Sequence, residues 1–252
     1  MCRIIAIMNQ MDGVGKTTTA MNLGYALALA GKKVSLLDMD PQGQLAISLG
    51  FKNDQGGLDR VLLEGEKLDN YLIPARDNLG VVCAGNNLAD FESIVTGGSS
   101  RGYLLRRAIE ASTLLAGDFV LIDCPSSSGL LGINAMFAAD ELVIPVSSDY
   151  SSLQGLSQMI HILKRSEAVS GHHIRIWIVS TRMQLKHRLT AEVRLRILKY
   201  FPGRVLNTVI RENASLAECA SFGLSVFEYQ EKSTGAEDYL LLAQDLLSGR
   251  TG

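Results

Sequence analysis

The sequence predicts an α/β fold: a single doubly wound, mainly parallel β-sheet with helices on both faces. Short runs rich in β-branched residues alternate with longer stretches of helical period, a pattern typical of parallel strands joined by crossover helices. A hydrophobic fraction of 47% over 252 residues supports one sizeable core. No Pro/Gly-rich linker or internal repeat divides the sequence. We therefore expect residues 1–252 to form one domain.

The expected strands are apolar runs rich in Val, Ile and Leu, too short for helices and bounded by polar or turn residues. In chain order they cover residues 3–8, 33–37, 79–83, 118–122, 141–146, 174–180 and 205–209.

The expected helices have apolar residues at helical spacing between turn signals. The first begins at Lys16 and stops before Gly31, a residue suited to a helix C-terminus. In chain order the helices cover residues 16–30, 43–49, 58–63, 89–95, 101–115, 129–138, 151–168, 187–200, 214–220 and 234–247.

Composition argues against several classes of protein. The formal charge is -2, from 24 Lys+Arg against 26 Asp+Glu, so bulk charge indicates neither a nucleic-acid nor a membrane partner. No apolar segment approaches the length of a membrane span, and the N-terminal run is too short for a signal peptide. The cysteines form no Cys-x-x-Cys pair, which favours reduced thiols in a cytosolic protein over disulfides or structural zinc. They are Cys2, Cys83, Cys124 and Cys219.

A glycine-rich loop, "NQMDGVGKTTT" at 9–19, separates the first expected strand from the first expected helix. Its glycines allow backbone N–H groups to approach phosphates, and the helix N-terminus adds partial positive charge. Lys16 would reach the β- and γ-phosphates, and the Thr17 hydroxyl would ligate Mg²⁺. The full G-x-x-x-x-G-K-[ST] pattern fails at its first position, Gln10. Taken alone, the motif leaves an ordinary strand–turn–helix open.

Carboxylates follow two expected strands. Asp38 and Asp40 come after one strand, at the edge where open α/β sheets bind ligands, and Asp123 follows another. Such carboxylates can hold Mg²⁺ through water and position an attacking water. Alternatively, the first two cap the helix at 43–49, and Asp123 belongs to a plain strand-end turn. Together with the loop lysine, the three carboxylates predict Mg-ATP binding.

With these motifs in place, the chain resembles the ParA/MinD family of deviant Walker A P-loop ATPases, especially its Soj-like partition branch. The matching pieces are "GVGKTTTAMNLGYALALAGKKVSLLDMDPQG", "FVLIDCPSS", "VIPVSSDYSSLQGL" and "TVIRENASLAECASFG". The resemblance implies a P-loop NTPase fold, slow Mg-dependent ATP hydrolysis and an ATP-dependent sandwich homodimer. It also implies nonspecific binding to double-stranded DNA of the nucleoid, in the cytoplasm. A ParB-like or cargo-adaptor partner would stimulate hydrolysis while a plasmid, chromosome region or other cargo is segregated or positioned.

The family's motifs also imply residue roles. Lys16, Asp40 and Asp38 would serve catalysis, with Asp40 orienting the attacking water. Thr17, Asp38 and Asp123 would surround the metal. The nucleotide would be bound by Asp12, Gly13, Val14, Gly15, Lys16, Thr17 and Thr18.

Two loop positions depart from the family. Where this chain has Met11, the family has a lysine that reaches the neighbouring subunit's phosphates, and where it has Asp12, the family has glycine. A carboxylate some 5 Å from a phosphate oxygen would cost about 3 kcal/mol at an effective dielectric near 20, or about a hundredfold in affinity. Alternatively, the Asp12 side chain faces solvent and only backbone amides face the phosphate.

A second departure concerns DNA. The family commonly has a proline at Arg211 and arginines at Glu212 and Ser215, some of them on its DNA-binding face. The stretch 182–204 is rich in cations and could neutralise DNA phosphates instead, although a solvated basic helix face is the simpler interpretation. The DNA-binding candidates are Arg182, Lys186, Arg188, Arg194 and Arg196.

Three functions compete on these observations. The first is a DNA-associated partition or positioning ATPase, and the second is a degenerate nucleotide switch with impaired hydrolysis, motivated by Met11. The third is a reductase like the nitrogenase iron protein. The sequence argues against this function, because Cys124 has no second cysteine in a matching loop. Membrane attachment is not expected, because the C-terminal tail begins with acids and has the pattern of a core-packing helix.

Overall fold

The computed structural model describes residues 2–93, 98–127, 129–184 and 186–252. Within them the strands form one sheet in the order β3-β4-β2-β5-β1-β6-β7-β8. All neighbouring strands are parallel except β3 and β4. The α/β doubly wound fold is therefore confirmed. The strands are β1 Arg3–Ile7, β2 Val34–Asp38, β3 Ile73–Arg76, β4 Leu79–Val82, β5 Phe119–Asp123, β6 Glu141–Ser147, β7 Arg175–Met183 and β8 Val205–Arg211.

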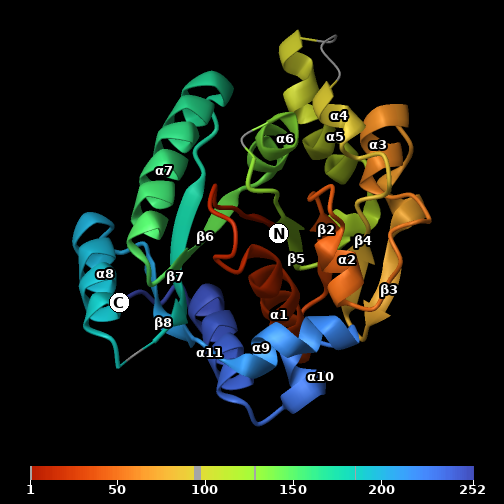
Figure 1. Cartoon of the computed structure of the whole chain (residues 1–252). Helices are drawn as coiled ribbons and strands as arrows, with labels where there is room; N and C mark the ends of the chain where they lie inside the picture. The colour runs from red at the N-terminus through yellow and green to blue at the C-terminus, as the bar shows by residue number, and fades with distance from the viewer. Residues whose placement is uncertain (1, 94–97, 128, 185) are drawn as a thin grey trace.

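Helices cover both faces of this sheet (Figure 1). Along β1, Ile4 and Ala6 enter one hydrophobic cluster while Ile5 and Ile7 enter the other, as the two-residue period of a strand requires. The first cluster includes residues of α3 to α8, and the second includes residues of α1, α2 and α9 to α11. The helices are α1 Lys16–Leu29, α2 Gln44–Ser48, α3 Leu58–Glu64, α4 Asp90–Ser93, α5 Leu104–Glu110, α6 Leu130–Ala138, α7 Tyr150–Ser170, α8 Arg188–Tyr200, α9 Ala214–Glu218, α10 Val226–Gln230 and α11 Thr234–Ser248.

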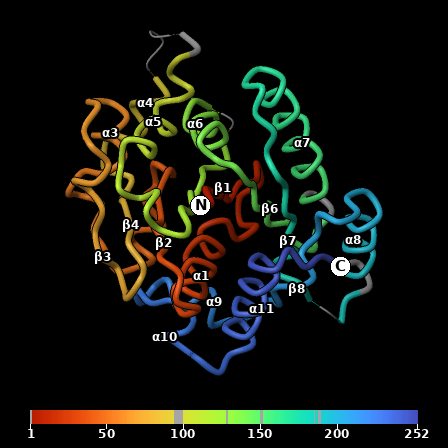
Figure 2. The backbone as a smooth tube through the Cα atoms, turned by 180° about the vertical axis from the view of Figure 1, so that it is seen from behind, coloured from red at the N-terminus to blue at the C-terminus, as the bar shows by residue number. Residues whose placement is uncertain are grey.

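The two ends of the chain are built into the fold. β1 lies inside the sheet between β5 and β6, and α11 packs against α1 and β8, as seen from behind in Figure 2. The predicted tail helix 234–247 is thus confirmed, with Leu242 and Leu246 buried. Among the residues that the structure describes, no helix has the length and hydrophobicity needed to span a bilayer.

Some predicted elements differ from the structure. A single helix over 101–115 is wrong: α5 is flanked by 3-10 turns at Gly98–Tyr103 and Thr113–Ala116, and the Ser112 side chain accepts a hydrogen bond from Leu114 N at the start of the second turn. The predicted helix 89–95 is described from Asp90 to Ser93 as α4, and its residues 94–95 lie outside the described part of the chain.

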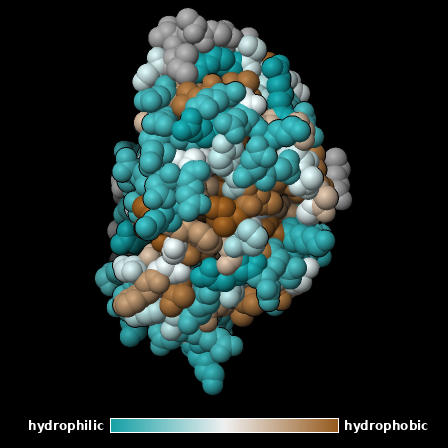
Figure 3. Space-filling model, turned by 90° about the vertical axis from the view of Figure 1, so that its right-hand side faces the viewer, coloured by the Kyte–Doolittle hydropathy of each residue, from teal (hydrophilic) through white to brown (hydrophobic). Residues whose placement is uncertain are grey.

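The prediction also missed two elements, β3 and α10. β3 contains Pro74, which the sequence pattern disfavours in a strand but which an edge strand tolerates. It belongs to the face shown in Figure 3, which is largely hydrophilic with an apolar patch near its middle. Arg76 at the end of β3 pairs with Glu228 at 2.5 Å, which ties this edge to α10.

Candidate functional site

The glycine-rich loop runs from the carboxyl end of β1 to the start of α1. Gly13 and Gly15 have φ of 72° and 90°, a left-handed conformation that glycine adopts without steric cost. Gly15 precedes the first residue of α1, and no side chain caps that helix end. The free N–H groups of the first turn are therefore available to a ligand, and together with the helix dipole they favour an anion.

Lys16 is buried, with 8% of its side chain exposed. Its ammonium donates a hydrogen bond to the Met11 carbonyl at 3.0 Å and lies 3.8 Å from a carboxylate oxygen of Asp12. The lysine thus bends back over its own loop.

Asp38 and Asp123 lie side by side, because β2 and β5 are neighbours and these two residues are paired in register. Both are fully buried. Asp38 accepts hydrogen bonds from Ala46 N, in the first turn of α2, at 3.1 Å and from Asp40 N at 3.3 Å. Burial, partly offset by these hydrogen bonds, raises the pKa of Asp38 to about 7.

Asp123 differs from Asp38 in its surroundings. Neither of its carboxylate oxygens has a hydrogen-bond partner of normal geometry among the described residues. Burial, and then the negative charge of Asp38, raise its pKa well above the ordinary value, while the nearby Thr17 hydroxyl and Lys16 act in the opposite direction. An unpartnered buried carboxylate is costly unless it is protonated or paired with a cation.

These residues fit Mg²⁺. Magnesium in nucleotide sites takes one or two carboxylates and keeps water and phosphate oxygens as its other ligands. Within the described ranges no three His, Cys, Asp or Glu side chains form a ready-made metal cage, so a bound ion would need ligands beyond the protein carboxylates. The hydroxyl of Thr17 and the phosphates of a nucleotide are ligands of that kind.

Asp40 is partly buried at the start of the turn that leads into α2. One of its carboxylate oxygens accepts a hydrogen bond from Gln42 N at 3.0 Å. The contact fixes the orientation of the carboxylate and uses one oxygen, so the other can face a ligand.

The two departing residues of the loop point in different directions. Met11 packs toward α7 at Gly155, where an added Cβ would lie 2.5 Å from Met11 Cγ. Asp12 is 90% exposed, which favours the solvent-facing alternative, and it accepts a hydrogen bond from Ser126. Asp12 thereby joins the loop to the segment after β5 and also keeps its charge near Lys16.

The structure separates the five DNA-binding candidates. Lys186 and Arg196 are exposed, while Arg194 donates hydrogen bonds to Ser180 Oγ at 3.2 Å and Asn207 O at 3.0 Å. Arg182 contacts the glycine-rich loop, with 3.0 Å between its Nη1 and Gly13 O. The side chain of Arg188 lies outside the described part of the structure.

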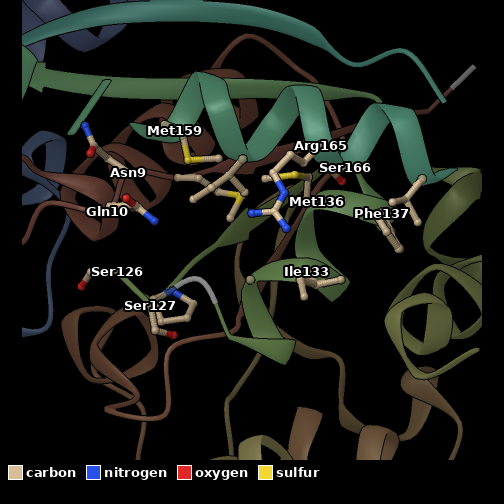
Figure 4. Close-up of a pocket in the computed structure, with 15 residues that line it drawn as sticks. Asn9, Gln10, Ser126, Ser127, Ile133, Met136, Phe137, Met159, Arg165 and Ser166 are labelled. Carbon is tan, nitrogen blue, oxygen red and sulfur yellow. The ribbon is translucent and has the colours of Figure 1, made fainter. Parts of the chain in front are cut away.

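Two cavities adjoin the loop. The larger, about 390 Å³, lies between α6 and α7 and is lined mainly by apolar side chains such as Met136, Phe137 and Met159 (Figure 4). The smaller, about 250 Å³, includes Gly13, Gly15 and Thr18 together with residues at the ends of β7 and β8. The smaller one is the better candidate for a nucleotide, because part of its wall is the loop backbone that we expect to bind phosphate.

Sequence reasoning missed several contacts of the loop. Thr181 Oγ1 donates to Val14 O at 2.8 Å, and Asn9 accepts from Met11 N at 3.0 Å while donating to Pro145 O at 2.7 Å. The contact of Ser126 with Asp12 was also missed, although the position of Ser126 shortly after Asp123 was a usable signal. Nothing local indicated Thr181, whose contact depends on the strand order.

Comparisons with known proteins find relatives that match nearly the whole chain. A profile described as "AAA domain" matches residues 2–176. The sporulation initiation inhibitor protein Soj of Bacillus subtilis is 38% identical over 250 residues, covering 98% of each chain. The chromosome partitioning protein ParA of Myxococcus xanthus is 37% identical over 259 residues, covering 99% of this chain and 89% of the relative.

A solved structure gives the same picture of the fold. Cobyrinic acid a,c-diamide synthase from Mycobacterium smegmatis, solved with an ATP analog and magnesium, superposes with a TM-score of 0.84 at 27% identity. The match covers 98% of this chain and 95% of that protein.

Proposed function

We propose a function for this chain from one premise: it belongs to the ParA/MinD family of P-loop ATPases, in the Soj-like partition branch. In this proposal, residues 1–252 form a single ATPase domain. It binds Mg-ATP, dimerises around the nucleotide, holds nonspecific duplex DNA of the nucleoid in the cytoplasm, and hydrolyses ATP slowly. A ParB-like or cargo-adaptor partner stimulates hydrolysis, and the cycle segregates or positions the cargo.

The observation that carries the nucleotide proposal is the unpartnered, buried carboxylate of Asp123 beside Asp38 and near Thr17. These three residues would hold Mg²⁺, which neutralises charge on phosphate oxygens when it is bound. A solved neighbour carries an ATP analog and magnesium, which supports the same ligands here.

The remaining roles belong to the loop and the turn after β2. Backbone N–H groups from Asp12 to Thr18 would cradle the phosphates, and Lys16 would turn from the Met11 carbonyl to a phosphate oxygen. Asp40, already oriented by Gln42 N, would accept a hydrogen bond from the attacking water and orient it.

DNA binding is proposed for the exposed cations around α8. Lys186 and Arg196 are exposed, and Lys199 and Arg204 are exposed nearby. Arg188 belongs to the same stretch. Arg194 is held to the sheet through Ser180 and Asn207, so it would contribute by orienting α8. Phosphate neutralisation by such cations is independent of sequence.

A second function is favoured by Met11. Its side chain packs on α7 and carries no charge, so the family's lysine contact across the dimer is lost. In that case the protein is a nucleotide-dependent switch whose dimer forms but hydrolyses ATP poorly.

ATP turnover with duplex DNA and the partner protein distinguishes the two functions. The partition cycle predicts a rate clearly above that of Asp40→Ala. A rate equal to that of Asp40→Ala would eliminate the cycle and leave the switch.

A further inference from the structure

We infer that Arg182 is a nucleotide-contacting cation of this chain, which acts on the phosphates bound by its own subunit and supplies charge that Met11 does not. The inference rests on the proposed Mg-ATP binding and adds a residue that the loop motif does not contain. Its evidence is the contact between the end of β7 and the loop.

Two consecutive residues at the end of β7 donate hydrogen bonds to the glycine-rich loop. Thr181 donates its hydroxyl to Val14 O at 2.8 Å, and Arg182 donates from Nη1 to Gly13 O at 3.0 Å. Two neighbouring side chains thus hold two neighbouring carbonyls. This arrangement fixes the guanidinium over the loop rather than on the outer face of α8.

Arg182 also lines the smaller cavity. Gly13, Gly15 and Thr18 belong to the same cavity, which is where the loop offers its backbone to a ligand. The Arg182 side chain is 58% exposed, so it can reorient toward a ligand without disturbing the core. An added Cβ on Gly13 would lie 3.7 Å from Arg182 Nη1, which shows how closely the guanidinium covers the loop.

The backbone of Arg182 is unusual. Its φ is 50°, and within the described ranges Asn78 is the other non-glycine residue with positive φ. Asn78 lies in the turn between β3 and β4, where asparagine commonly adopts this conformation. Arginine has no such tendency, and strained residues of this kind concentrate at functional sites.

Arg182 has one acidic partner, and both side chains of this ion pair are partly exposed to solvent. Arg182 forms an ion pair with Glu212 at 3.6 Å, and Glu212 also accepts a hydrogen bond from Gln184. The neighbouring Arg211 is engaged by Asp238 at 2.6 Å and Glu237 at 2.7 Å. A guanidinium has several N–H donors in a planar fork that matches phosphate oxygens, so Arg182 can keep Gly13 O and still bind a phosphate.

The test is an equilibrium titration of the full-length protein with a fluorescent ATP analogue and Mg²⁺, together with thermal melting without nucleotide. Arg182→Gly removes the guanidinium and supplies the residue that suits a positive φ. We expect its affinity to fall about tenfold or more, while its melting temperature holds or rises. Arg182→Lys should recover part of the affinity. The matched control is Arg107→Ala, which removes an exposed charge on α5 and should bind as the wild type does.

Three results would overturn the inference. One is wild-type affinity in Arg182→Gly while Lys16→Ala has lost binding, which would leave the proposed function intact. Another is a parallel fall of affinity and melting temperature in Arg182→Gly without recovery by Arg182→Lys, which would indicate a structural role. The third is an absence of nucleotide binding by the wild type, which would remove the proposed function as well.

Discussion

Replacing Asp12 by Asn should strengthen Mg-ATP binding. The exchange keeps the size of the side chain and its ability to accept a hydrogen bond from Ser126, but it removes the negative charge. In the structure this charge lies 3.8 Å from the Lys16 ammonium. Lys16 must give up that attraction when it turns to a phosphate, and the remaining carboxylate then repels the phosphate.

The magnitude follows from the distance and the exposure. At 3.8 Å, Coulomb's law gives about 4 kcal/mol at an effective dielectric of 20 and about 1 kcal/mol in water. Although Lys16 is buried, Asp12 is 90% exposed, so we use the lower value, about 1 kcal/mol, which lies at the upper end of measured surface ion pairs. One kcal/mol corresponds to about fivefold in affinity.

The assay is the titration with a fluorescent ATP analogue at low and high salt. Asp12→Asn should bind about fivefold more tightly than the wild type at low salt, and the gain should shrink at high salt because exposed charges are screened. Ser126→Ala, which removes the hydroxyl but keeps the carboxylate, is the matched control and should stay within about twofold of the wild type. An affinity of Asp12→Asn equal to or below that of the wild type would show that the Asp12 charge does not oppose nucleotide binding.

Three other predictions concern DNA, packing and pH. Lys186→Ala with Arg196→Ala should weaken duplex binding and lower its salt slope by about two; an unchanged slope would place the DNA site elsewhere. Gly155→Ala should lower stability by about 1–3 kcal/mol through overpacking against Met11, and Met11→Ala should relieve this in the double variant; an unaltered melting curve contradicts the contact. Burial alone would raise the pKa of Glu141, but hydrogen bonds from Arg3 and Trp177 lower it. The ionised Glu141 carboxylate therefore stabilises the fold at pH values above its unfolded-state pKa, and this stabilisation is lost as pH falls through its folded-state pKa. Glu141→Gln should be less stable than the wild type at pH 7 by about 1–3 kcal/mol and should lose less stability on acidification. Parallel curves of stability against pH for the two proteins would disprove this.

The sequence was informative wherever a local pattern decided the structure. The predicted strands all exist, because buried parallel strands need continuous apolar runs. The edge strand β3 was missed because Pro74 obscured it, whereas α10 had a usable signal, the capping box of Ser225 and Glu228. The helix predicted at 101–115 failed because Ser112 offers the backbone an alternative hydrogen bond.

Part of the candidate site could be predicted from local sequence patterns, and part could not. The proximity of Asp38 and Asp123 follows from two strands that end at one edge of a sheet. The contact of Arg182 with Gly13 does not, because it joins residues far apart in sequence and depends on the order of the strands and on a positive φ. Counting cations along the stretch placed Arg182 with the DNA candidates, since charge patterns contain no information on which loop a side chain covers.

The central claim is that the loop from Gly13 to Thr18, with Asp38 and Asp123 behind it, binds Mg-ATP. Calorimetric titration of the wild-type protein with ATP, in the presence and absence of Mg²⁺, tests it most directly, with Asp123→Ala as the comparison. We expect saturable binding that is strengthened by Mg²⁺ in the wild type and is insensitive to Mg²⁺ in Asp123→Ala. Binding of equal strength with and without Mg²⁺ in the wild type, or no binding at all, would contradict it.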